Sequence, residues 1–275
     1  MSAFRGSASP TQSWNHFGFA VEDGVATITF DRPKKLNALT FQVYADLRDL
    51  LTELPQRDDA RVLVITGTGR GFSSGGDVTE IIGELQKMDP RDLLAFTRMT
   101  GTVTQRMRDC PLPIVASVNG VAAGAGAVIA LASDLRIMAA SATFSFLFTK
   151  VGLSGGDMGS AYLLPRLVGL GRASELLLLG EPVTAPRALA IGLANAVVED
   201  SELSAQTSEV ARRLANGPAL AYAATKMLLS KQLDMNLSAA LELDSMTQAL
   251  LMKSADHQEF FAAFREGREP KWSGR

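Results

Sequence analysis

The chain has 275 residues, of which 47% are hydrophobic and 20% are charged, and its formal net charge is −2. These values are ordinary for a soluble globular protein, and they give no support to nucleic acid or an anionic membrane surface as a partner. No apolar run approaches the roughly 20 residues that a membrane-spanning helix needs, so no membrane association is expected.

The N-terminal end and the rare reactive residues limit the chemistry further. Residues 1–16 lack the apolar core of a signal peptide, so we expect a flexible N-terminal segment on a cytoplasmic chain. Cys110 is alone, which excludes an internal disulfide and a cysteine metal cluster. The two histidines, His16 and His257, lie far apart in polar segments, so neither a Ser–His–Asp triad nor a multi-histidine metal site is expected. An enzyme with this sequence would depend on carboxylates and backbone amides, and nothing in it calls for a cofactor or metal.

Strands and helices are predicted to alternate in the first two-thirds of the chain. Residues 18–22 and 25–30 alternate in polarity around "EDGV", which predicts a hairpin. Apolar residues recur at three- and four-residue spacing over 41–54, which predicts a helix. The elements expected next are a strand over 61–67, helices near 78–87 and over 91–108, a strand over 113–120, a helix over 121–134 and a strand over 135–140.

From about residue 158 the pattern is almost entirely helical. Alternating strands and helices followed by helices alone indicate an α/β core with a helical C-terminal region. We expect the core to span residues 17–200 and the helical region to span residues 201–275. The predicted helices are 158–168, 172–179, 184–191, 202–216, 218–231, 236–252 and 255–266.

Two predicted strands end in glycine-rich loops that lead into helices: "FSSGGD" (72–77) and "NGVAAGAG" (119–126). A helix N-terminus carries unpaired N–H groups, and small side chains let a ligand oxygen approach them. Two such loops side by side would supply two converging donors, which is the geometry of an oxyanion hole. Tight packing of a helix against a sheet is the alternative for "GAGAVIA". A dinucleotide site is disfavoured because the third small residue of its pattern falls one position late, at Ala130.

Several motifs, in order, resemble the enoyl-CoA hydratase/isomerase (crotonase) family over residues 17–272. The matching stretches are "VATITFDRPKKLNAL" (25–39), "RGFSSGGDV" (70–78), "PLPIVASVNGVAAGAGAVIALASDLRI" (111–137), "KVGLSGGDMGSAYLLPRLVG" (150–169) and "AAFREGREPKW" (262–272). The resemblance implies a spiral of ββα units, a C-terminal helical region used for oligomerisation, and homotrimers or homohexamers. It also implies an acyl-CoA thioester as substrate, with coenzyme A arriving as part of that substrate.

The resemblance also assigns roles to particular residues. The backbone N–H groups of Gly76 and Ala125 would hold the thioester oxygen while it carries the charge of an enolate. Phe264, on a C-terminal helix, would meet the adenine end of coenzyme A in a neighbouring subunit. The positions matching the family's coenzyme A contacts are Lys34, Leu36, Ala38, Ser74 and Val78.

The chain departs from the family at both catalytic glutamates. The matching positions are Val128 and Phe148, and an apolar side chain cannot activate water. Asp157, in "GLSGGDMGS", matches a segment that lines the active site in the family, and an apolar pocket would raise its pKa and suit it to proton transfer. Its alternative role is to cap the helix predicted to start at 158, and capping is also the expected role of Asp77.

One acid or base above an oxyanion hole favours double-bond isomerisation, although hydration or carbon–carbon cleavage stays open. Ser154 and Ser160 are further candidates for orienting a water or a substrate hydroxyl. The other class of function is a catalytically silent acyl-CoA-binding or scaffold protein, which the apolar Val128 and Phe148 would suit.

Overall fold

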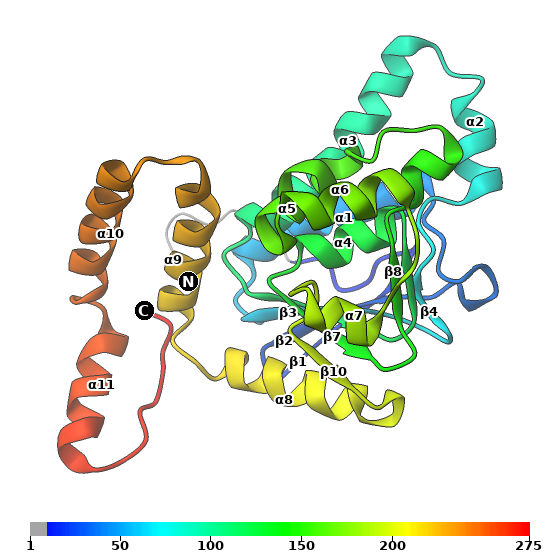
Figure 1. Ribbon diagram of the computed structural model, residues 1–275. Helices are drawn as coiled ribbons and strands as arrows, with labels where there is room; N and C mark the ends of the chain where they lie inside the picture. Colours follow the sequence, from blue (N-terminus) through cyan, green and yellow to red (C-terminus); the bar gives the residue numbers. More distant parts are fainter. Residues whose placement is uncertain (1–9) are drawn as a thin grey trace.

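A six-stranded sheet lies at the centre of the computed structural model, which describes residues 10–275 (Figure 1). Its order is β1-β2-β3-β5-β7-β10; β1 and β2 form the predicted antiparallel hairpin, and all later pairs are parallel. The strands are β1 (Gly18–Glu22), β2 (Val25–Phe30), β3 (Val62–Gly67), β5 (Ile114–Val118), β7 (Leu135–Ala139) and β10 (Ala196–Val198).

A second sheet of four short strands has the order β4-β6-β8-β9. Three times the chain leaves a strand of the large sheet, forms a strand of the small sheet and continues into helix: β3 to β4, β5 to β6, and β7 to β8. This repeat is a spiral of ββα units, so the expected fold class is confirmed. The strands are β4 (Gly71–Ser73), β6 (Val121–Ala123), β8 (Thr143–Ser145) and β9 (Val183–Thr184).

Helices cover both sheets and extend beyond them at the C-terminal end (Figure 1). They are α1 (Phe41–Glu53), α2 (Gly83–Leu85), α3 (Pro90–Asp109), α4 (Ala125–Ala132), α5 (Ser160–Val168), α6 (Leu170–Leu179), α7 (Ala185–Ala190), α8 (Leu203–Ala215), α9 (Ala219–Lys231), α10 (Leu237–Leu251) and α11 (Ala255–Glu266). Short helical turns that matter below are η1 (Pro33–Lys35), η3 (Val78–Ile82, a π-helix), η4 (Leu147–Val151) and η5 (Asp157–Gly159).

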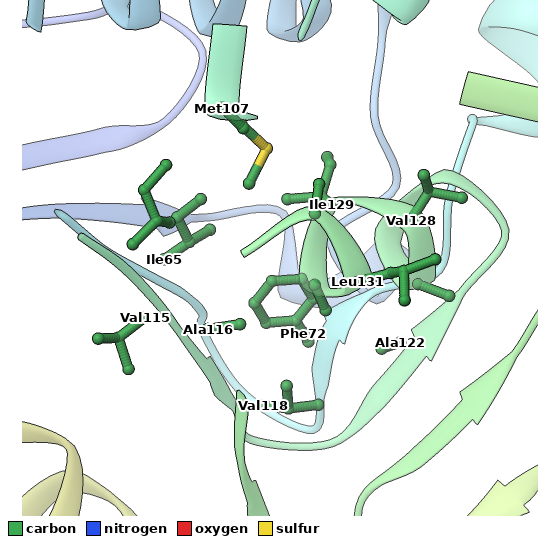
Figure 2. Close-up of a cluster of buried hydrophobic side chains, with 14 of the residues drawn as sticks. Ile65, Phe72, Met107, Val115, Ala116, Val118, Ala122, Val128, Ile129 and Leu131 are labelled. Carbon is green, nitrogen blue, oxygen red and sulfur yellow. The ribbon is translucent and has the colours of Figure 1, made fainter. Parts of the chain in front are cut away.

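The core is packed where the two sheets meet α4. All eight residues of α4 are buried, because the helix lies between the small sheet and α3. Figure 2 shows its side chains Val128, Ile129 and Leu131 together with apolar residues from β3, β4, β5, β6 and α3. The strand β5 is buried along its whole length, as expected for a central parallel strand covered on both faces.

The boundary of the core differs from the prediction. Helix α8 packs on β3, β5 and β7, and its Leu203, Ala211 and Ala215 are buried in the core. The core therefore extends through α8. Helix α9 still contacts α3, and α10 and α11 stand away from the core (Figure 1). On α9, α10 and α11 large apolar residues are exposed, and α10 has no buried residue.

Several short elements also differ from the sequence prediction. Residues 121–134 do not form one helix, because Val121–Ala123 pairs with β4 and β8 as a strand before α4 begins. The helix expected near 78–87 starts as a π-helix and continues as α2. The sequence did not predict strands β4, β8, β9 and β10, because a strand of only two or three residues is too short to show a period in its apolar residues.

The N-terminal segment 1–16 is described only from residue 10. Within that part, the Thr11 N–H and hydroxyl both donate to the Glu53 carboxylate, at 2.8 and 2.6 Å, and Arg57 donates to the Thr11 carbonyl at 2.7 Å. The described end of this segment is thus attached to α1. None of the helices within residues 10–275 combines the length and the apolar character that a membrane crossing requires.

Candidate active site

The two glycine-rich loops lie against each other, backbone to backbone. A Cβ atom added to Gly75, which has φ +90°, would lie 2.8 Å from the Ala123 carbonyl oxygen and 3.2 Å from the Ala125 nitrogen. A Cβ atom on Gly126 would lie 2.3 Å from the Ser73 carbonyl oxygen. Only glycine allows so close an approach, so these small residues bring the ends of β4 and β6 together.

Both expected donors are unpaired at this junction. Hydrogen bonds join the Leu39 N–H to the Gly75 carbonyl at 2.8 Å and the Asp77 N–H to the Leu39 carbonyl at 2.9 Å, which leaves out the Gly76 N–H between them. Ala125 is the first residue of α4, where N–H groups have no partner within the helix. Within residues 10–275, neither the Gly76 N–H nor the Ala125 N–H donates a hydrogen bond. The junction can therefore offer two donors to one oxygen.

Four of the predicted coenzyme A contacts gather at the segment before α1. The Ser74 N–H donates to the Leu36 carbonyl at 2.9 Å, and the Ser74 hydroxyl donates to the Lys35 carbonyl at 3.2 Å. Lys34 is exposed on η1, and Ala38 is buried. Residues 34–38 thus lie along the first glycine-rich loop, as a shared binding surface would require.

Val78 and Asp77 follow Gly76 at the start of η3. Val78 is 70% exposed, which is unusual for valine and leaves an apolar surface beside the Gly76 N–H. The Asp77 carboxylate accepts from the N–H groups of Thr79 and Glu80 at 3.0 and 3.1 Å, so its expected role as a cap is confirmed. Burial alone would raise the pKa of Asp77, but these hydrogen bonds, with the charges of Lys35 and Arg32, lower it.

Phe264 lies on α11, away from the loops of its own chain (Figure 1). Its side chain is 75% exposed and stands beside Phe260 on the same helix. Arg268 is engaged in ion pairs with Glu259 and Glu266. The structure therefore does not bring Phe264 to the other site residues within one chain, and only a neighbouring subunit could do so.

Asp157 lies in a glycine-rich segment, residues 152–159, that we call the Asp157 loop. Its side chain does not cap α5: the residue before α5 is Gly159, and no side-chain cap forms there. Burial raises the pKa of Asp157, as expected, and a hydrogen bond from the Met158 N–H lowers it by less. Met158 itself has φ +50°, a left-handed backbone that costs energy for a side chain of this size.

The two serines near Asp157 have structural roles. The Ser160 hydroxyl is fully buried and donates to the carbonyls of Gly155, at 2.5 Å, and of Asp157, at 2.9 Å. The Ser154 hydroxyl accepts from the Gly156 N–H at 3.1 Å. Both hydroxyls help to hold the Asp157 loop, and their expected role in orienting a water or substrate hydroxyl stays a prediction.

Val128 and Phe148, which the resemblance matches to two catalytic glutamates, are both buried. Val128 is fully buried on α4, within the cluster of Figure 2, and Phe148 on η4 is 6% exposed. Neither position offers a polar atom.

Tyr44 is the residue that sequence reasoning missed, because its place in an apolar helical pattern indicated only core packing. Its hydroxyl oxygen lies 3.9 Å from the position of a Cβ atom on Gly76. Burial raises the pKa of Tyr44, and the negative charge of Asp157 raises it further. The hydroxyl is thus close to Gly76, and it is near enough to Asp157 for that charge to raise its pKa. Gly76 and Asp157 therefore lie on the same side of the molecule.

The ββα spiral and the paired loop-to-helix junctions place this chain in the crotonase fold class. The sequence model described as enoyl-CoA hydratase/isomerase matches residues 20–275. The chain belongs to this family and is an acyl-CoA-processing enzyme, as the sequence motifs predicted.

Individual relatives cover nearly the whole chain. It is 36% identical over 260 residues to 1,2-epoxyphenylacetyl-CoA isomerase of Escherichia coli (strain K12), covering 93% of this chain and 97% of the relative. It is 38% identical over 263 residues to a Rhodobacter capsulatus protein named "Probable enoyl-CoA hydratase", covering 96% and 100%. The crystal structure of a "putative enoyl-CoA hydratase" from Streptomyces coelicolor A3(2) has a TM-score of 0.97 and 59% identity, and the match covers 100% of both chains. The names of these relatives include both isomerase and hydratase, so the reaction depends on the site.

Proposed function

We propose that this enzyme forms and reprotonates the enolate of an acyl-CoA thioester, and that double-bond isomerisation is its reaction. The observation that carries the proposal is the pair of unpaired N–H groups at Gly76 and Ala125, on the same side of the molecule as a carboxyl whose pKa is raised. These groups supply the two elements of enolate chemistry, charge stabilisation and proton transfer.

In the proposed reaction the Asp157 carboxylate removes a proton from the acyl chain. The electrons of the broken C–H bond move through the conjugated system onto the thioester oxygen, which accepts hydrogen bonds from Gly76 and Ala125. The Asp157 carboxyl then gives a proton to another carbon while the electrons return from the thioester oxygen, and the double bond has moved. Solvent exchange of the carboxyl proton between the two steps carries deuterium into the substrate in D₂O. A raised pKa suits this transfer because it makes the Asp157 carboxylate a stronger base toward carbon than an ordinary carboxylate.

The absence of a carboxylate at residues 128 and 148 argues against the usual hydration mechanism. Hydration needs a group that activates water and a second that delivers its proton, whereas isomerisation needs one group that does both steps on carbon. The isomerase activity in the name of the Escherichia coli relative supports the same choice.

We further propose that coenzyme A binds along residues 34–38, Ser74 and Val78, and that the enzyme needs no cofactor beyond the coenzyme A of its substrate. We also propose a homotrimer or homohexamer. The exposed apolar side chains of α9–α11 support assembly, because a lone chain would leave this surface in water. They include Leu229, Leu237, Leu241, Leu250, Phe261 and Phe264.

The test is exchange of the α-protons of acyl- and enoyl-CoA thioesters in D₂O, across chain lengths and aromatic acids. We expect exchange with the unaltered protein and a loss of about 10²- to 10⁴-fold in Asp157→Asn, with thioester affinity retained. Asp200→Asn is the matched control, because this exposed carboxylate only bonds Ser141.

Unchanged exchange in Asp157→Asn would overturn the role of Asp157. Tight thioester binding without exchange in the unaltered protein would instead favour a silent acyl-CoA-binding protein.

A further inference from the structure

Tyr44 is a buried residue whose hydroxyl group forms no hydrogen bond. The residue is 3% exposed, and its ring packs edge to face on Phe96 of α3, with centroids 5.9 Å apart. Within residues 10–275 the Tyr44 hydroxyl has no hydrogen-bond partner. The hydroxyl oxygen is not one of the fully buried polar atoms without a partner, so this end of the side chain reaches a small open space where an acceptor could bind.

The hydroxyl is held in a fixed position relative to the proposed oxyanion donors. Leu39, five residues before Tyr44, forms two backbone hydrogen bonds with the loop that carries Gly76, at 2.8 and 2.9 Å. The hydroxyl oxygen lies 3.9 Å from the position of a Cβ atom on Gly76, and Ile81 reaches the same position at 3.9 Å. The group is therefore close to Gly76, the residue whose N–H is a proposed donor to the thioester oxygen.

The protonation state of Tyr44 makes it a donor. Burial and the charge of Asp157 both raise its pKa, so the hydroxyl keeps its proton at neutral pH. The thioester oxygen has two donors of its own at Gly76 and Ala125 in the proposed function. The acceptor that Tyr44 lacks must then be a different oxygen atom.

We infer that Tyr44 determines substrate specificity by donating a hydrogen bond to an oxygen on the acyl chain, near its α-carbon. The substrates of this enzyme are then acyl-CoA thioesters with an oxygen function close to the thioester, in preference to plain hydrocarbon chains. The inference rests on the proposed function, because it uses the thioester position next to Gly76. To that proposed function the inference adds the chemical class of the acyl group.

The test compares dissociation constants for butyryl-CoA, 2-hydroxybutyryl-CoA and 3-hydroxybutyryl-CoA, measured by titration calorimetry. We expect the unaltered protein to bind one hydroxy derivative about 3- to 10-fold more tightly than butyryl-CoA, as one added hydrogen bond predicts. Tyr44→Phe should abolish this preference and change the constant for butyryl-CoA less than about twofold. The control is Tyr162→Phe, which removes an exposed hydroxyl that donates to Asp234 and should keep the preference.

Two results would overturn the inference: no preference in the unaltered protein, or an equal loss for all three ligands in Tyr44→Phe. An equal loss would mean that Tyr44 acts on the thioester or on Asp157, which all three ligands share. The preference of the unaltered protein is measured even if Tyr44→Phe does not fold. Failure of all three thioesters to bind would overturn the proposed function itself, a result distinct from either of these.

Discussion

Replacing Gly75 with alanine tests the proposed oxyanion hole through the spacing of its two loops. The new Cβ atom would lie 2.8 Å from the Ala123 carbonyl oxygen, whereas ordinary contact begins at 3.4 Å. The loops must therefore separate by roughly half an ångström, and the Gly76 and Ala125 N–H groups lose their common target. Since misplacement by about 1 Å costs on the order of 10²-fold in rate, and loss of one donor about 10²- to 10³-fold, we expect α-proton exchange to fall about 10²-fold.

Alanine at Gly75 also strains the backbone, and a matched variant separates this effect. Gly24 has φ +80° in the hairpin between β1 and β2, and a Cβ atom there meets only ordinary contacts at 3.6 Å and beyond. Both variants should lose on the order of 1–2 kcal/mol of stability from the left-handed backbone, measured by urea unfolding. Only Gly75→Ala should lose exchange.

Exchange in a folded Gly75→Ala protein that stays within about threefold of the unaltered rate would refute the reasoning. It would mean either that the loops tolerate separation or that Gly76 and Ala125 do not act together.

Three further substitutions test the electrostatics and the packing. Because burial raises the pKa of Asp157, the folded state binds its proton more tightly than the unfolded state does, and stability rises as pH falls through the folded pKa. Asp157→Asn should therefore raise the melting temperature at pH 8, and this gain should vanish below about pH 4, where both states are protonated. Asp77→Ala removes a helix cap and should cost about 1–2 kcal/mol in urea unfolding at pH 7. Since the pKa of Asp77 is lowered, this loss should shrink as pH falls through that pKa, and a constant loss would contradict the cap. Val128→Glu places a carboxylate in the buried cluster of Figure 2 and should cost about 3 kcal/mol or more; a variant as stable as the parent would show that this face of α4 is open.

Sequence patterns predicted the long elements because their apolar spacing is strong. The hairpin, α1, α3 and the C-terminal helices were all expected close to their observed bounds. The short strands of the small sheet were not, since their hydrogen bonds depend on neighbours from distant parts of the chain. The run 121–134 is the clearest example: its alanines favour helix, yet pairing with β4 and β8 holds Val121–Ala123 in a strand.

The site was predictable in part for the same reason. Gly76 and Ala125 lie in loops whose small residues stand out in the sequence. Tyr44 could not be recognised, because its position beside Gly76 depends on the bonds between Leu39 and the neighbouring loop. Its spacing in α1 carried only the signal of a core residue. The Ser160 hydroxyl bonds the carbonyls of Gly155 and Asp157 within its own motif, but this depends on the fold of the loop, which the residue types alone do not reveal.

If Asp157 transfers the proton as we propose, the Asp157 loop separates the chemistry of this enzyme from its stability. The resemblance matches Val128 to a catalytic glutamate. Val128 is fully buried in the packed core, so its neighbours must move to accommodate any change of this side chain. Leu153 of the loop is 58% exposed, and Ser154 is exposed as well, so few neighbours would have to adjust to a change at either residue. Residues of this kind can be exchanged, inserted or deleted at small cost in folding. The loop is therefore the natural place for protein engineers to graft a different proton-transfer group, and for duplicated genes to diverge in reaction while they keep one scaffold.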